Sequence, residues 1–209
     1  MNAVYNTPEV QRMASEHVNP ALYIDVDTLR PKPKNDILLI VATAPCNWND
    51  VLTFACIGDG YDVMCINHVA LAFGYKFQYF ATGDSHIGLF RSIAKELKRQ
   101  LGLGLTSHCY HPHSNGFDIR WIRKDKTCRG TSTMFGVEVG LALGYLKIVL
   151  AGAPMDSSGH FYDKARPDFE NRLDEWVKLA GGPLACFIRS MSGNTRDLFG
   201  EPTKEWLNE

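Results

Sequence analysis

Two uninterrupted apolar runs limit the folds that this chain can adopt. Residues 37–44 read ILLIVATA, and residues 148–151 read IVLA before Gly152. A strand with one buried face alternates apolar and polar residues, whereas an unbroken apolar run fits a strand buried on both faces of a parallel sheet. The second run follows residues 131–145, which have helical spacing. The sequence therefore predicts a parallel sheet with helices on its faces.

The same succession of strands and helices extends along most of the chain. We expect further strands at residues 61–67, 77–82, 103–109, 119–122 and 184–189, and helices at 48–58, 87–101 and 169–179 with a short helix or loop at 68–74. This order is typical of the α/β class, as a three-layer sandwich with a mostly parallel, Rossmann-like sheet. We expect residues 37–209 to form a single domain and residues 1–36 to pack on it as an N-terminal arm. Residues 190–209 carry turn signals.

Composition narrows the function classes. Hydrophobic residues make up 45% of the 209-residue chain and charged residues 22%, as in ordinary globular proteins. The net charge of −1 gives no general attraction to nucleic acid or to an anionic membrane. No apolar stretch reaches the roughly 18–20 residues of a membrane span, and the N-terminus has no signal-peptide pattern. The six cysteines form no CxxC pair, so we expect reduced thiols and a cytoplasmic location. We also expect a homo-oligomer.

Polar side chains follow several of the predicted strands. They are Thr43, Asn47 and Asn49; Asn67 and His68; Asp84, Ser85 and His86; and Asp156, Ser158, His160 and Asp163. Because the carboxyl ends of parallel strands share one edge of a sheet, these residues can converge on one crevice. Taken singly, such residues also cap helices and form turns.

His160 is the leading candidate for acid–base chemistry, because an imidazole titrates near neutral pH. Asp156 and Asp163 flank it in sequence and can orient it. A surface histidine in a polar loop is an equal alternative. His86, beside Asp84, is the second candidate.

Residues 130–133, reading GTST, precede a predicted helix. Small residues at a helix N-terminus leave backbone N–H groups available for a phosphate or carboxylate. Ser132 or Thr133 can equally be a simple N-cap. The chain has no GxxxxGK[ST] or GxGxxG fingerprint. Residues 108–113 hold three histidines and a cysteine, but no second ligand cluster accompanies them, and we favour a histidine-bearing loop over a zinc site.

Several of these positions together resemble a known group of proteins. The matching residues are Asp62, Val63 and Asn67; Phe80, Thr82 and Asp84; and Thr131, Ser132, Gly136, 142–145, Ile148, Leu150 and Gly152. The pattern resembles the bacterial sialyltransferase-like group, which includes CMP-sialic-acid-dependent transferases and the archaeal pterin pyrophosphokinase-like proteins. It covers roughly residues 37–165, and the tail resembles uncharacterised phage proteins.

The resemblance implies a Rossmann-like sheet that binds a nucleotide at its strand ends. It implies that Asn67 and Ser132 contact the nucleotide or its phosphates, and that the loop after Gly152 holds the base or ribose. It also implies that His160 is the general base. We therefore expect a nucleotide-binding, glycosyltransferase-like transferase with a nucleotide-activated sugar as donor. The expected ligand-binding residues are Asn67, Thr131, Ser132, Thr133 and Gly152, and the expected catalytic residues are His160, Asp156 and Asp84.

Two alternatives stay open. A Mg²⁺-dependent pyrophosphokinase or nucleotide hydrolase would use Asp84 and Asp156 to hold the metal. A non-catalytic phage or prophage accessory protein would keep the fold and lose the chemistry. Ala42 and Ala44 favour that second alternative, because they stand where the resembling proteins carry glycines.

Overall fold

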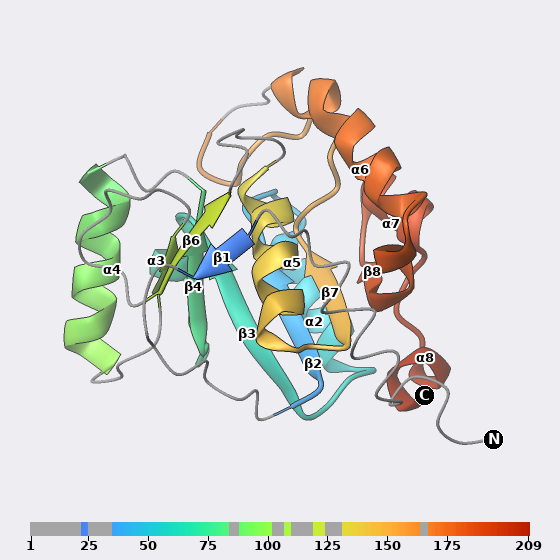
Figure 1. The fold of residues 1–209 in the computed structure, drawn as a ribbon, viewed down its shortest axis with the longest axis horizontal. Helices are drawn as coiled ribbons and strands as arrows, with labels where there is room; N and C mark the ends of the chain where they lie inside the picture. The colour runs from blue at the N-terminus through green and yellow to red at the C-terminus, as the bar shows by residue number, and fades with distance from the viewer. Residues whose placement is uncertain are drawn as a thin grey trace.

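An eight-stranded sheet forms the centre of the computed structural model, which describes residues 22–24, 35–83, 88–101, 107–109, 119–123, 131–163 and 167–209 (Figure 1). Its strands are β1 (Leu22–Ile24), β2 (Ile37–Val41), β3 (Tyr61–Ile66), β4 (Tyr79–Thr82), β5 (Ser107–Cys109), β6 (Ile119–Arg123), β7 (Lys147–Ala151) and β8 (Ile188–Ser190). They lie in the order β1-β6-β5-β4-β3-β2-β7-β8. The strands from β6 to β8 in this order are parallel, and β1 pairs antiparallel with β6 at the edge.

Helices cover both faces of the sheet. The helical elements are α2 (Asn47–Ala55), α3 (Val69–Ala72), α4 (Gly88–Leu101), α5 (Ser132–Leu143), η1 (Pro167–Arg172), α6 (Leu173–Ala180), η2 (Pro183–Phe187), α7 (Gly193–Phe199) and α8 (Lys204–Asn208). One core layer packs α5, α6 and α7 against the sheet, and the other packs α2, α3, α4 and α8 against its opposite face. Figure 1 shows α5 crossing the sheet on one side and α2 on the other. The fold is therefore the expected Rossmann-like α/β sandwich.

Strand β2 explains why the chain needs both layers. Leu38 and Ile40 belong to the core under α5, whereas Leu39 and Val41 belong to the core under α2. Each of these four side chains is fully buried. Successive side chains of a strand point to opposite faces, so an unbroken apolar run becomes buried only when both faces are covered.

The predicted strands and helices are largely confirmed, with differences near the C-terminus. The strand expected at residues 184–189 is wrong over its first half, because η2 (Pro183–Phe187) is a 3₁₀ helix and β8 begins only at Ile188. Proline at the first position suits a helical turn, since the missing N–H would have had no partner there. The tail forms α7 and α8 rather than turns alone. Thr203 caps α8 by accepting from the Trp206 N–H, and Trp206 and Leu207 are buried.

The strand order places a topological switch point beside β2. Strands β3 to β6 follow one another to one side of β2, and β7 returns to its other side. Ligands of open α/β sheets bind in the crevice outside the carboxyl ends of the strands at such a point. A ligand site is therefore expected at the carboxyl ends of β2 and β7. Among the described residues, no helix has both the length and the apolar character needed to cross a membrane.

Candidate functional site

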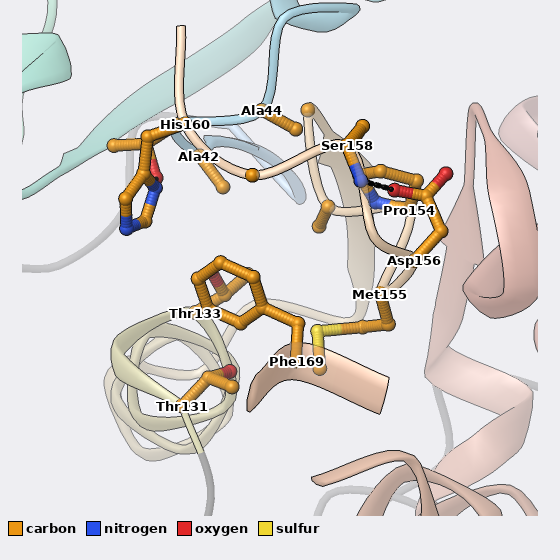
Figure 2. Close-up of a pocket in the computed structure, with 14 residues that line it drawn as sticks. Ala42, Ala44, Thr131, Thr133, Pro154, Met155, Asp156, Ser158, His160 and Phe169 are labelled. Carbon is orange, nitrogen blue, oxygen red and sulfur yellow. Dashed lines mark hydrogen bonds between the residues drawn. The ribbon is translucent and has the colours of Figure 1, made fainter. Parts of the chain in front are cut away.

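A crevice of about 320 Å³, counting its open mouth, lies at the carboxyl ends of β2 and β7 (Figure 2). Its lining comes from four segments: Ala42, Thr43 and Ala44 after β2; Gly152, Ala153, Pro154, Met155, Asp156, Ser158, Gly159 and His160 after β7; Thr131 and Thr133 at the start of α5; and Phe169 of η1. Figure 2 shows His160 at one end of the crevice and Asp156 with Ser158 at the other. The structure thus brings His160, Asp156, Gly152, Thr131 and Thr133 to one cavity.

Thr43 fixes the imidazole of His160. Its Oγ1 lies 2.5 Å from His160 Nδ1, and its carbonyl oxygen accepts from the Phe161 N–H at 2.7 Å. Phe169 meets the imidazole edge-on, with ring centroids 5.0 Å apart. In the tautomer whose Nδ1–H donates to Thr43 Oγ1, the lone pair that can accept a proton is on Nε2. The apolar neighbours and the hydroxyl hold the ring in one orientation, which is what a general base requires.

Asp156 does not orient His160, contrary to one role considered for it. Its Oδ1 accepts from the Ser158 N–H at 2.9 Å, so the carboxylate closes a turn at the opposite end of the crevice (Figure 2). Asp163 meets His160 through the backbone, where its N–H donates to the His160 carbonyl at 3.1 Å. Thr43, 117 residues away in sequence, supplies an orienting contact that no local pattern predicts.

The start of α5 borders the crevice. Thr131 is the N-cap residue, and its side chain accepts from the Met134 N–H at 3.2 Å, so neither Ser132 nor Thr133 is the cap. Ser132 Oγ instead accepts from the Gly83 N–H after β4 at 3.3 Å. Thr133 is buried and lines the crevice. The first turn of a helix carries partial positive charge and unbonded N–H groups, so this border suits an anionic ligand.

Two non-glycine residues with left-handed backbone follow the strands that flank β2. Asn67 follows β3 and Met155 follows β7, and both have φ of 53°. Such a conformation is strained for a methionine and tends to occur where function demands it. Asn194 holds the Met155 turn, because its N–H and side-chain amide donate to the Pro154 and Met155 carbonyls, each at 2.8 Å. Asn67 does not line the crevice.

Several other sequence candidates lie outside the described residues. Asp84, Ser85 and His86 fall in residues 84–87, and His111 and His113 fall in residues 110–118. The side chains of His108 and Cys109 are not described either. In the described part of the chain, no group of three histidine, cysteine or carboxylate side chains is arranged to hold a metal ion.

A buried carboxylate that was not predicted from the sequence holds the loops beside the crevice in place. Asp50 of α2 accepts from the Gly152 N–H at 2.8 Å and from the Ser192 hydroxyl at 2.7 Å. Ser192 Oγ also lies 3.3 Å from Cys46 Sγ. Burial raises the pKa of the Cys46 thiol to about 11, so Cys46 is uncharged at neutral pH and is a poor nucleophile. Asp50 therefore ties the loops after β7 and β8 to α2.

Asp50→Ala is expected to lower the free energy of unfolding by about 1–3 kcal/mol, because it leaves the buried Gly152 N–H without an acceptor. Urea denaturation measures the change. Asp50→Asn keeps one acceptor oxygen and should lose less. The exposed Asp59→Ala serves as control, and equal stability of Asp50→Ala and Asp59→Ala would contradict the supporting role.

No protein-family model, curated protein or solved structure matches this chain. The fold and the geometry of the crevice therefore carry the functional argument.

Proposed function

We propose that this protein is a nucleotide-binding transferase, glycosyltransferase-like, that uses a nucleotide-activated sugar as donor. The observation that carries this proposal is a single crevice, at the switch point of a Rossmann-like sheet, that holds both an oriented imidazole and the start of a helix. The first feature can accept a proton, and the second can hold a phosphate.

The donor phosphates would lie against the first turn of α5, near Thr131 and Thr133. Ser132 supports this turn through its bond with the Gly83 N–H rather than from the crevice wall. The loop after Gly152 would hold the base or ribose. Asp84, which comes two residues after β4 in the sequence, is proposed to hold donor or acceptor, whereas Asn67 does not line the crevice.

His160 would act as the general base. Its Nε2 takes the proton of an acceptor hydroxyl while the acceptor oxygen bonds to the anomeric carbon of the sugar. The bond from that carbon to the phosphate oxygen breaks, and the nucleotide leaves with the electron pair. The partial positive charge at the start of α5 stabilises the departing phosphate.

Nucleotide binding is the first test. In a thermal-shift series against CMP, CDP, UDP, GDP and ATP, with and without Mg²⁺, we expect CMP or CDP to stabilise the protein without Mg²⁺. A ligand at about 100 times its Kd adds roughly 2.7 kcal/mol, which raises the Tm of a chain of this size by several degrees.

Matched variants locate the binding. Thr133→Val changes a buried hydroxyl of the crevice and should reduce the shift, whereas Thr53→Val on the exposed side of α2 should leave it unchanged. A shift that requires Mg²⁺ and a triphosphate would favour the pyrophosphokinase alternative. No shift with any nucleotide would overturn the proposed function and favour a non-catalytic protein.

A further inference from the structure

The segment that follows β8 holds the loop that forms one wall of the crevice. Three consecutive carbonyl groups of this loop accept hydrogen bonds from two residues of that segment. The Ala153 carbonyl accepts from the Thr195 hydroxyl at 2.6 Å. Asn194 binds the next two carbonyls, because its N–H donates to Pro154 and its side-chain amide donates to Met155, each at 2.8 Å. The carbonyls of this part of the loop therefore all face the segment after β8.

The direction of these carbonyls fixes the direction of two N–H groups. In a trans peptide the C=O and the N–H point in opposite directions, and the described part of the chain has no cis peptide. The Met155 N–H shares its peptide plane with the Pro154 carbonyl, and the Asp156 N–H shares its plane with the Met155 carbonyl. Both N–H groups therefore point away from Asn194. Met155 and Asp156 line the crevice and Asn194 does not, so the two N–H groups lie on the crevice side of the loop.

Neither N–H group has an acceptor among the described residues. The hydrogen bonds of the described chain use neither the Met155 N–H nor the Asp156 N–H. Met155 is only 6% exposed. A buried backbone N–H without a partner is rare in folded proteins, because leaving it unpaired costs free energy. These two donors therefore point to a ligand group that accepts hydrogen bonds.

A phosphate fits these donors because the facing wall also attracts anions. Figure 2 shows Thr131 and Thr133, at the start of α5, on the other side of the crevice from Pro154 and Asp156. None of the described lining residues is a lysine or an arginine, so backbone N–H groups supply the donors for an anion. The Asp156 carboxylate is engaged by the Ser158 N–H, which offsets part of its negative charge. A phosphate has several anionic oxygens and can accept from both walls at once.

We propose that the Met155 and Asp156 N–H groups bind a phosphate oxygen of the donor, and that Asn194 is the positioning residue that keeps them directed at it. This site rests on the proposed function for its role in transfer, where the N–H groups stabilise the charge that develops on the departing phosphate. The rest of the loop after Gly152 stays available for the base or ribose. Binding of phosphate itself requires neither the sugar nor the nucleoside.

Inorganic pyrophosphate without Mg²⁺ is the first probe. It is titrated into the isotope-labelled whole chain at constant ionic strength, and the backbone amide signals are followed by NMR. We expect saturable downfield proton shifts of the Met155 and Asp156 amides, because a hydrogen bond to an anionic oxygen deshields the proton. Acetate should bind more weakly, since one carboxylate cannot reach both walls. The site is overturned if pyrophosphate moves neither amide, or if acetate binds more tightly than pyrophosphate.

The same titration separates this site from the proposed function. Saturable shifts of both amides, in a protein that no nucleotide stabilises, would support the phosphate site and overturn the proposed function. Stabilisation by a nucleotide that moves neither amide would overturn the phosphate site alone.

Variants of Asn194 test its positioning role. Asn194→Ala should weaken pyrophosphate binding about tenfold, because the peptide that carries the Asp156 N–H loses its anchor and can turn. Asn208→Ala is the matched control. The Asn208 side-chain amide also donates to a backbone carbonyl, that of Lys204 at 2.7 Å, but Asn208 does not line the crevice, so this variant should bind as the wild type does.

Adding Met155→Gly to Asn194→Ala distinguishes positioning from stability. Glycine adopts the positive φ of residue 155 without steric cost, so the double variant should regain most of the lost affinity. Its stability should fall further, because it also lacks a buried side chain. The positioning role is overturned if Asn194→Ala binds pyrophosphate as the wild type does, or if the double variant binds as weakly as Asn194→Ala. Asn194→Leu, which keeps the side-chain volume, replaces Asn194→Ala with the same expectation if the alanine variant does not fold.

Discussion

Gly152→Ala is expected to be among the most damaging single substitutions in this chain, lowering the free energy of unfolding by roughly 2–5 kcal/mol. Gly152 has φ of +68°, a conformation that L side chains rarely adopt. A Cβ at this position would lie 2.4 Å from Asn47 Cβ and 2.7 Å from the Ala42 carbonyl oxygen. Asn47 begins α2 and Ala42 directly follows β2. Because both neighbours belong to rigid elements, moving either one away from the added Cβ would cost free energy.

Alanine substitutions of two other glycines distinguish the steric cause of this loss of stability from the conformational cause. Gly74→Ala places its Cβ in open space without a positive φ, and should be nearly neutral. A Cβ at Gly144 would also have no atom within 4 Å, but Gly144 has φ of +98°. The loss of stability in Gly144→Ala therefore measures the conformational cost alone. Urea denaturation of the three variants gives the comparison. A Gly152→Ala protein as stable as Gly74→Ala would contradict the close approach of β2, β7 and α2 at the crevice.

His160→Ala is expected to reduce the rate of sugar transfer by about 10²–10⁴-fold, the usual contribution of a general base. Nucleotide affinity should stay close to that of the wild type, because the phosphates are proposed to lie against α5 and not against the imidazole. Initial rates with sugar donors of the nucleotide identified by thermal shift, together with calorimetric titration of that nucleotide, measure the two effects separately.

Thr43→Val distinguishes orientation from chemistry. It keeps the shape of the side chain but removes the hydroxyl that lies 2.5 Å from His160 Nδ1, so transfer should fall less than in His160→Ala. A folded His160→Ala protein that transfers sugar at the wild-type rate, or that loses nucleotide binding, would contradict the role of His160 as base.

Some elements around the crevice could be predicted from the sequence, and others could not. The apolar runs that become β2 and β7 were predictable, because a strand that is buried on both faces is apolar at consecutive positions. Segment η2 was not, since four apolar residues after a proline fit a strand or a tight helical turn equally well. His160 was identifiable by its chemistry and by its place after β7. The partner that orients it, Thr43, was only one of several polar residues after β2.

Asp50 and the aromatic neighbours of His160 show why contacts of the site were missed. Asp50 stands in the first turn of α2, where a carboxylate is common for local reasons, and its bond with the Gly152 N–H spans 102 residues. Tyr162 does not belong to a periodic apolar pattern. It stacks on His160 and lies against His68 because the loops after β3 and β7 meet. No pattern of consecutive residues encodes such pairs.

The sequence by itself determined the α/β class, the order of most strands and helices, and the edge of the sheet at which polar residues gather. These features follow from local periodicity and from the rule that parallel strands share their carboxyl ends. Only the tertiary structure decided which of those polar residues share a cavity. That selection depends on the switch of strand order beside β2, which brings the loop after β7 against Thr43 and the start of α5. Contacts between residues far apart in the chain are set by packing, and packing is a property of the whole fold.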